Sequence, residues 1–320
     1  MHYDVFNGDA DGIVSLLQLR LAQPKNSSLI TGVKRDIKLL RQVSAQADVD
    51  SVTVLDISME KNVEPLIALL AREVPVFYCD HHRAGEVPAS ERLTALIDLA
   101  PEVCTSLLVN DHLQGQFAKW AVVGAFGDNL FTQARQLATT LSLSEEDIDF
   151  LLELGTLINY NGYGASLVDL HIEPSELYRK LLAYPCPLML REDSGSPYYE
   201  LKSGYAADYR YIADLIPLDE TEVSCVYELP NEAWARRISG VFGNELANMT
   251  PSKAHAVLTL NESGDDYTVS VRAPLENRVG ADEICSGFPT GGGRKAAAGI
   301  NQLPVAEKAK FIQALTSYYA

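Results

Sequence analysis

The stretch Val74-Pro75-Val76-Phe77-Tyr78-Cys79-Asp80-His81-His82 decides the fold, because an apolar run ends there in one carboxylate and two imidazoles. A short apolar run of this length is typical of a buried strand. In a parallel α/β sheet the carboxyl ends of the strands open onto one crevice, where ligands bind. The polar tripeptide is therefore expected at such an edge.

Three further apolar runs end in aspartates in the same way. They are followed by Asp9-Ala10-Asp11-Gly12, by Asp56 and by Gly127-Asp128. Like charges that share a site raise one another's pKa or attract cations. Two divalent ions bridged by an aspartate would compensate such a cluster, and metal pairs of this kind catalyse in-line displacement at phosphorus. We therefore expect a phosphoryl-transfer site formed by Asp9, Asp11, Asp56, Asp80, His81, His82 and Asp128.

Apolar runs alternate with helical patterns through the first half of the chain. We expect strands at about 3–6, 29–33, 51–55, 74–79, 94–98 and 120–126. Helical patterns separate them at Ile13–Ala22, Ile37–Ala47, Val63–Arg72 and Thr105–Leu113. This alternation predicts an α/β fold with a doubly wound, mostly parallel sheet. Residues 130–184 favour helices, two of which begin near Ser144 and Glu173.

A change of pattern after residue 184 predicts a second domain. Turn-forming residues over 185–215 indicate a linker. We therefore predict a catalytic metal-binding domain at 1–184 and a smaller α+β substrate-binding domain at 216–320. The second domain is expected to contain a strand, a helix, a hairpin and two further helices, at Val223–Glu228, Glu232–Met249, His255–Ala273, 280–286 and 304–319.

Composition limits the classes of partner. The chain has 43 acidic and 26 basic side chains, a net charge of −17. A long nucleic acid needs a positive surface, so it is disfavoured, whereas a short substrate with few phosphates remains compatible. The five cysteines have no metal or redox spacing, and neither a leader nor a membrane span is recognisable. We expect a cytoplasmic protein with reduced thiols and no membrane partner, and a homodimer stays open.

The donor types indicate which metal the site would prefer. Oxygen-rich ligation with imidazole and without thiolate favours manganese or magnesium over zinc, and the histidine favours manganese. An extended Asp-x-Asp would place its two carboxylates on one side of the chain, about 7 Å apart. Each element also has an ordinary reading, because Asp-x-Asp-Gly and Gly-Asp alone are most often turn signals. Their joint occurrence favours the metal site.

The ordered set Asp9-Ala10-Asp11-Gly12, Asp56, Asp80-His81-His82 and Asp128 resembles the DHH phosphoesterases. The downstream Gly291-Gly292-Gly293-Arg294-Lys295-Ala296-Ala297-Ala298-Gly299 and Ser270-Val271-Arg272 resemble the DHH-associated C-terminal domain. The resemblance spans nearly the whole chain. It implies a bilobed fold with the active site in the cleft between the lobes.

The resemblance also implies a role for each site residue. Asp9 and Asp56 would bind one manganese ion. The other ion would be bound by Asp11, Asp56, His81 and Asp128, so that Asp56 bridges the two. His82 would face the scissile phosphate, and Asp80 would orient the histidines. Gly291–Gly293 would form an anion-binding nest, with Ser270 and Arg272 beside it.

Two residues depart from the family pattern. Asn7 stands nearest to the place where many members carry a metal-binding histidine, and it is either a weak neutral ligand or a simple turn residue. Arg294 stands where most relatives carry histidine. A guanidinium pairs bidentately with guanine, so Arg294 would favour a guanine base. The alternative is that it binds a second phosphate.

The expected activity is that of a manganese-dependent phosphodiesterase of the nanoRNase type, an oligoribonuclease-like hydrolase. Its substrates would be short linear oligonucleotides, such as pGpG, the linear breakdown product of cyclic di-GMP, and its products 5′-mononucleotides. Magnesium is the alternative metal. Two other functions stay open: a phosphatase acting on 3′-phosphoadenosine 5′-phosphate, and a non-catalytic nucleotide-binding protein.

Overall fold

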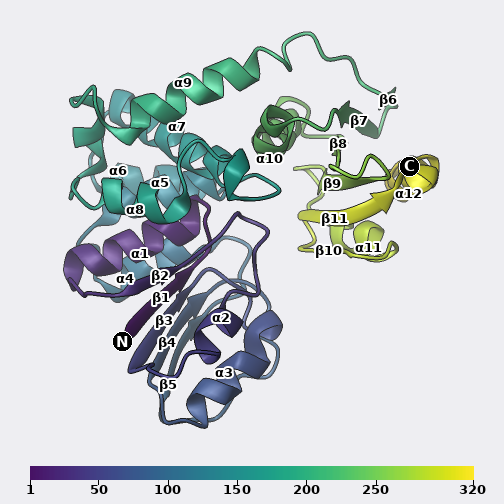
Figure 1. Cartoon of the computed structure of the whole chain (residues 1–320). Coiled ribbons are helices and arrows are strands. Elements are labelled where there is room, and N and C mark those ends of the chain that lie inside the picture. Colours follow the sequence, from purple (N-terminus) through teal and green to yellow (C-terminus); the bar gives the residue numbers. More distant parts are fainter. The chain divides into compact units, whose positions relative to one another are not determined.

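The computed structural model describes all 320 residues, which form two compact units, Met1–Gly204 (unit 1) and Tyr205–Ala320 (unit 2). Each unit contains one sheet (Figure 1). The expected linker, 185–215, includes the 3-10 helix η3 (Pro187–Arg191) and the helix α9 (Pro197–Tyr209), which crosses the division between the units. The domain bounds 1–184 and 216–320 stay a prediction.

The sheet of unit 1 has five parallel strands in the order β2-β1-β3-β4-β5. The strands are β1 (His2–Phe6), β2 (Ser28–Ile30), β3 (Ser51–Leu55), β4 (Val76–Asp80) and β5 (Leu93–Ile97). The predicted doubly wound α/β fold is thereby confirmed. The strand order reverses between β1 and β3, and ligands bind at the carboxyl ends of the strands beside such a reversal.

Helices cover both faces of this sheet (Figure 1). One face packs against α2 (Leu40–Ser44) and α3 (Val63–Leu70), and the apolar side chains of these two helices share a buried core with those of β1, β3 and β4. The other face carries α1 (Ala10–Ala22) and α4 (Thr105–His112), and α5 (Ala118–Gly127) packs on these two helices. The remaining elements are η1 (Glu60–Asn62), α6 (Phe131–Thr140), α7 (Glu145–Asn161), η2 (Leu167–Asp169) and α8 (Pro174–Leu181).

The strand predicted at 120–126 is wrong, because these residues lie within helix α5. Every residue from Trp120 to Gly127 is buried. A continuous apolar run of this length fits a buried helix as well as a buried strand, so its pattern could not separate them. Asp128 therefore follows a helix rather than a strand.

Unit 2 contains a six-stranded sheet in the order β10-β11-β9-β8-β7-β6. The strands are β6 (Asp219–Glu220), β7 (Ser224–Leu229), β8 (Ala254–Leu260), β9 (Asp266–Arg272), β10 (Gly291–Gly293) and β11 (Ala297–Pro304). Only β7 and β8 pair in parallel, with α10 (Ala233–Met249) between them in sequence. Strands β8 and β9 form the predicted hairpin.

Alternate residues of these strands face opposite sides of the sheet. Ala256 and Leu258 of β8 share a buried core with α11 (Ala281–Ser286) and α12 (Lys308–Tyr319), which follows the short η4 (Val305–Glu307). Val257 and the β9 residues Ser270 and Arg272 lie on the other side, 3.9 Å from the place where a Cβ on Gly243 of α10 would stand. Unit 2 is thus a mixed α+β unit.

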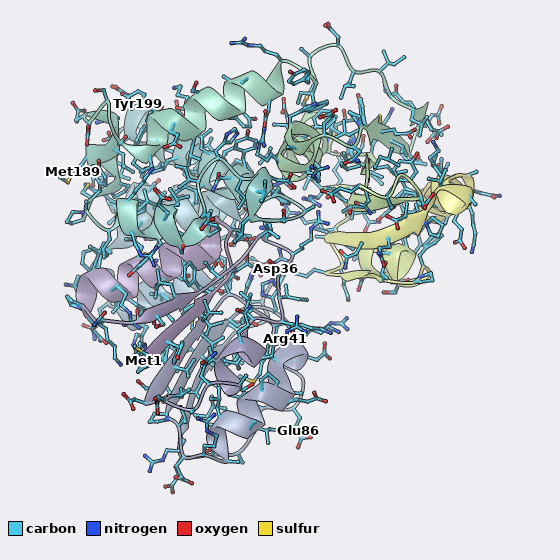
Figure 2. The ribbon with its side chains drawn as sticks, in the orientation of Figure 1. Met1, Asp36, Arg41, Glu86, Met189 and Tyr199 are labelled. Atoms are coloured by element: carbon cyan, nitrogen blue, oxygen red, sulfur yellow. The ribbon has the colours of Figure 1, made fainter.

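Polar side chains cover much of the outer surface, and Arg41 and Glu86 illustrate this in Figure 2. Large apolar side chains are exposed in places, such as Met189 and Tyr199. None of the helices is both long enough and apolar enough to cross a membrane.

Candidate metal centre

Asp9 and Asp11 lie where β1 passes into α1. Asp9 is the N-cap of α1, and its Oδ1 accepts the Gly12 N–H at 3.0 Å. Asp11 belongs to the first helical turn, so the expected extended Asp-x-Asp segment is not formed. The turn requires glycine at position 8, because a Cβ there would stand 1.8 Å from the Gly32 carbonyl oxygen. Both aspartates are buried.

The carboxylate of Asp11 is held by the N-terminus of α4. Its Oδ2 accepts the Thr105 N–H at 2.7 Å, and its Oδ1 accepts the Ser106 N–H at 2.8 Å. The free amides and the dipole of a helix N-terminus favour an anion. Asp11 is thereby fixed in one orientation.

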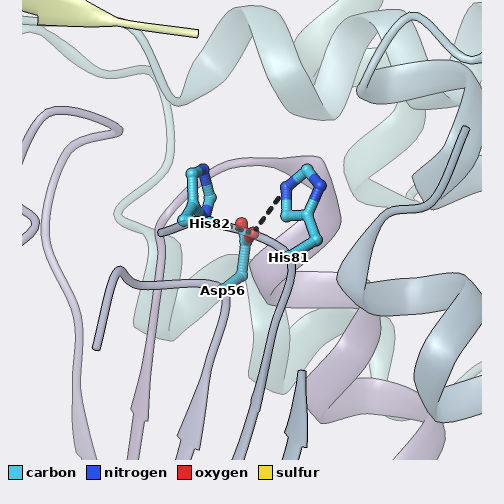
Figure 3. Close-up of side chains that lie close together, drawn as sticks. All are labelled: Asp56, His81 and His82. Carbon is cyan, nitrogen blue, oxygen red and sulfur yellow. Dashed lines mark ion pairs between the residues drawn. The ribbon is translucent and has the colours of Figure 1, made fainter. Parts of the chain in front are cut away.

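Asp56 follows β3 in a left-handed backbone conformation, with φ of 58°. Such a conformation is uncommon for a residue other than glycine and recurs at functional sites. The Thr105 hydroxyl donates to Asp56 Oδ1 at 3.1 Å. The same oxygen lies 3.4 Å from His81 Nε2 (Figure 3).

The orientation of His81 is the most telling feature of the cluster. Its Nδ1 lies 2.8 Å from the carbonyl oxygen of Val103, which can only accept, so Nδ1 carries a proton. In the neutral ring Nε2 then presents a lone pair. This atom lies 3.4 Å from Asp56 Oδ1 and 3.9 Å from both Asp11 Oδ2 and Asp128 Oδ2. A lone pair among three carboxylates is the arrangement of a histidine that binds a metal cation.

His82 faces a different way from His81. Its Nδ1 lies 2.7 Å from Asp80 Oδ1, and its side chain is 32% exposed, against 2% for His81. Asp80 is completely buried, and its Oδ2 has no hydrogen-bond partner. Ligand atoms of His82, His81 and Asp56 all lie within 4.8 Å of one another (Figure 3). Asp80 therefore orients His82 at the accessible side of the cluster.

The crowded carboxylates perturb one another. Burial, and then the negative charges of Asp9, Asp11, Asp80 and Asp128, raise the pKa of Asp56 well above its usual range. Burial also raises the pKa of the neighbouring Cys79 and Cys104 thiols, which therefore stay protonated. The donor set is thus carboxylate and imidazole without thiolate. It fits a hard or intermediate divalent cation such as Mn²⁺ or Mg²⁺.

Lys34 is a site residue that the sequence patterns did not reveal. Its ammonium contacts Asp9 Oδ2 and lies 3.0 Å from Asn159 Oδ1. Burial alone would raise the pKa of Asp9 and lower that of Lys34. The attraction between the two charges outweighs burial, so the pKa of Asp9 is lowered and that of Lys34 is raised. Lys34 comes directly after the strand expected at 29–33, and this position at a strand end was the one signal in the sequence that it could belong to the site.

Asn7 is placed beside the cluster with both ends of its amide engaged. Its Oδ1 accepts the Asp9 N–H at 3.2 Å, and its Nδ2 donates to the Lys34 carbonyl oxygen at 3.2 Å. These contacts give Asn7 a role in holding the turn, and metal ligation by its amide stays a prediction.

The predicted substrate residues all lie in unit 2. The guanidinium of Arg272 donates to Asn244 Oδ1 at 2.6 Å, to Ser270 Oγ at 2.9 Å and to the carbonyl oxygens of Val271 and Gly240 at 3.1 and 3.3 Å. Asn244 and Gly240 belong to α10 and carry no sequence signal of this role. Arg272 is therefore held in one orientation, and its contact with phosphate stays a prediction.

The glycines 291–293 form a short edge strand. Gly291, Gly292 and Gly293 pair with Ile300, Gly299 and Ala298 of β11. Arg294 begins the tight turn that follows, where its N–H donates to the Ala297 carbonyl oxygen at 2.8 Å, and its side chain is exposed. The three glycines thus form a paired strand followed by a basic turn, and anion binding there stays a prediction.

Solved structures of the same fold include two of RecJ. The exonuclease RecJ bound to manganese matches with a TM-score of 0.63 at 17% identity, over 99% of this chain and 89% of that one. RecJ from Thermus thermophilus in complex with Mn²⁺ gives 0.65 at 17% identity, over 99% of this chain and 52% of that one. Neither a protein-family model nor a curated protein sequence matches the chain.

A third solved structure of this fold is the pGpG-specific phosphodiesterase PggH from Vibrio cholerae. It matches with a TM-score of 0.54 at 11% identity, over 100% of this chain and 99% of that one. At these identities the likenesses show a shared fold, in which the α/β sheet of unit 1 is followed by a second sheet.

Proposed function

We propose that this chain is a metal-dependent phosphodiesterase of the DHH family, which hydrolyses short linear oligonucleotides to 5′-mononucleotides. Dinucleotides such as pGpG are its preferred substrates. The orientation of His81, whose Nε2 faces three carboxylates, carries the proposal of a metal centre. The fold that the chain shares with RecJ and PggH supports phosphodiester bonds as its target.

Manganese is the proposed metal, with magnesium as the alternative. Asp11, Asp56, His81 and Asp128 would hold one ion, and the family pattern adds a second ion at Asp9 and Asp56. A bound ion would supply an activated water and would withdraw charge from the phosphoryl oxygens. Asp11 is oriented for this task by the amides of Thr105 and Ser106 before any ion binds.

His82 is the proposed phosphate-facing residue. Asp80 fixes its Nδ1, so Nε2 lies on the opposite side of the ring. From there a protonated Nε2 can donate a hydrogen bond to a phosphoryl oxygen, and it can pass its proton to the leaving oxygen as the ester bond breaks. Asp80 balances the positive charge of the ring from its buried position.

Unit 2 would bind the remainder of the substrate. Arg272 and Ser270, the strand Gly291–Gly293 and Arg294 are the proposed contacts for the second phosphate and the base. The net charge of −17 favours a short ligand held by this local basic group over a long polyanion.

Five free cysteines, four of them buried, fit the reducing cytoplasm, which is the proposed location.

The proposal is tested with purified protein, Mn²⁺ and a panel of possible substrates. The panel contains linear RNAs of two to seven nucleotides, cyclic dinucleotides and 3′-phosphoadenosine 5′-phosphate. We expect the fastest release of 5′-mononucleotides from dinucleotides. Preferred release of phosphate from 3′-phosphoadenosine 5′-phosphate would establish the phosphatase instead, and dinucleotide binding without any turnover would establish a binding protein.

We further predict that Arg294 biases the enzyme toward guanine. Replacing it by alanine should reduce the preference for pGpG over pApA by roughly tenfold, because one bidentate arginine–guanine contact contributes about 1–3 kcal/mol of discrimination. Hydrolysis of the four homodinucleotides by wild type and Arg294→Ala measures this. The neighbouring exposed Lys295 provides the control, since Lys295→Ala should leave base preference unchanged. An unaltered preference in Arg294→Ala refutes the guanine contact.

A further inference from the structure

Lys34 is held inside the metal centre by its backbone as well as by its ammonium. Its N–H donates to the Gly162 carbonyl oxygen at 2.8 Å, and its carbonyl oxygen accepts the Asn7 side-chain amide at 3.2 Å. Asp36, labelled in Figure 2, closes the same turn by accepting the Val33 N–H at 3.1 Å. With the backbone fixed on both sides, only the side-chain rotamers of Lys34 remain to be ordered when the ammonium reaches Asp9.

The ammonium lies where a cation is needed. It contacts Asp9 Oδ2, lies 3.0 Å from Asn159 Oδ1 and stands 5.4 Å from the centre of the Tyr163 ring. The Lys34 side chain is only 27% exposed, and that of Asp9 only 5%. Lys34 therefore compensates the charge of Asp9, one of the two aspartates assigned to the first ion.

Asn7 and Asp9 both point to the same conclusion. The side-chain amide of Asn7 accepts a hydrogen bond from the Asp9 N–H and donates one to the Lys34 carbonyl oxygen. Asp9 Oδ1 accepts the Gly12 N–H, and Asp9 Oδ2 accepts the Lys34 ammonium. Asn7 thus helps to position Lys34, and the ammonium of Lys34 neutralises Asp9.

We infer that the ammonium of Lys34 takes the place of the first divalent ion, so that this centre binds one ion, held by Asp11, Asp56, His81 and Asp128. The inference rests on the proposed metal centre and changes its stoichiometry from two ions to one. A divalent ion on Asp9 would have to displace Lys34, because the two carboxylate oxygens of Asp9 are already engaged by the Gly12 N–H and by the ammonium. Lys34 would then supply from a fixed position part of the positive charge that a second ion would bring to the phosphoryl group.

Manganese stoichiometry tests the inference without any measurement of activity. Equilibrium dialysis followed by metal analysis counts the bound ions. Electron paramagnetic resonance separates an isolated Mn²⁺, which gives a six-line signal, from two close and magnetically coupled ions. Wild type should bind one ion per chain with the isolated signal. Lys34→Met, which keeps the length of the side chain and removes its charge, should bind two ions with a coupled signal.

Two further variants serve as controls. Lys34→Arg keeps the charge and should bind one ion, as should Lys61→Met, whose lysine is exposed and pairs with Glu60 instead of an aspartate of the cluster. Two ions in wild type overturn the inference but leave the proposed function intact. One ion in a folded Lys34→Met protein also overturns it. No ion in wild type contradicts the metal centre itself, and if Lys34→Met does not fold, the wild-type and Lys34→Arg spectra still decide the number of ions.

Discussion

At the scale of single residues, Asp56 connects backbone conformation to chemistry. Its positive φ costs a residue other than glycine roughly 1–3 kcal/mol. The conformation directs the carboxylate toward His81 and Thr105 rather than along the strand. The fold therefore retains a strained residue at the point where a cation would be bound.

The two histidines of the cluster should respond differently to substitution. His82→Ala is expected to bind Mn²⁺ like wild type and to lose roughly 10²–10³-fold in kcat, because it removes a donor to the phosphoryl group but no ion ligand. Metal analysis and single-turnover hydrolysis of a dinucleotide measure the two quantities separately. Loss of the ion in His82→Ala would make His82 a ligand and would contradict its assignment to phosphate.

Asp4 lies in β1 and is expected to contribute to stability in acid. It is completely buried and accepts hydrogen bonds from Arg20 and Ser27. Burial alone would raise its pKa, but Arg20, His2 and Ser27 outweigh burial and lower the pKa from 3.8 to about 2. A lowered pKa in the folded state stabilises the fold above the unfolded pKa, and this stability is lost as pH falls toward the folded pKa.

The pH window of this loss lies between about 4 and 2. Between pH 5 and pH 3 the free energy of unfolding of wild type should fall by about 1 kcal/mol more than that of Asp4→Asn. Urea unfolding of both proteins at the two pH values measures the difference. Equal losses in the two proteins would show that Asp4 does not contribute.

At the scale of elements, three helices meet closely behind the centre. A Cβ on Gly127 of α5 would stand 2.4 Å from the Cβ of Ala10 in α1, and one on Gly155 of α7 would stand 2.4 Å from the Val123 carbonyl oxygen of α5. This close packing allows α5 to place Asp128, and α7 to place Asn159, at the ends of the strands. Site geometry therefore depends on helix packing.

Gly155→Ala should separate α7 from α5. We expect a loss of about 1–3 kcal/mol in the free energy of unfolding, together with at least tenfold weaker Mn²⁺ binding. Ser144→Ala is the matched control in the same helix, because it removes the N-cap bond to Asp147. It should lower the free energy of unfolding by about 1 kcal/mol without weakening Mn²⁺ binding. Calorimetric titration with Mn²⁺ compares the two. Unchanged affinity in Gly155→Ala would contradict the dependence of the site on this packing.

The sequence predicts those elements whose ends carry local signals. The strand expected at 51–55 agrees with β3, and Ser144 caps α7 as expected. Helix α5 was missed because an unbroken apolar run has no period that distinguishes helix from strand. Lys34 was missed because its partners Asp9 and Asn159 lie 25 and 125 residues away along the chain. Such a contact follows from tertiary structure alone.

At the scale of the whole molecule, the net charge bears on the length of the proposed substrate. A net charge of −17 opposes a long polyanion, whereas a dinucleotide carries few phosphates to repel. Both units carry part of the predicted machinery, with the carboxylate cluster in unit 1 and the fixed Arg272 in unit 2.

The measurement that tests the account most directly is the Mn²⁺-dependent hydrolysis of pGpG by wild type and by Asp56→Asn. Asparagine tolerates the left-handed conformation of residue 56, so the variant should fold and yet lose the carboxylate. We predict release of GMP by wild type with Mn²⁺, no release after chelation, and at least a roughly 10³-fold lower rate with weakened metal binding in Asp56→Asn. Hydrolysis that persists in the chelator, or that is equally fast in Asp56→Asn, would contradict a metal-dependent phosphodiesterase at this site.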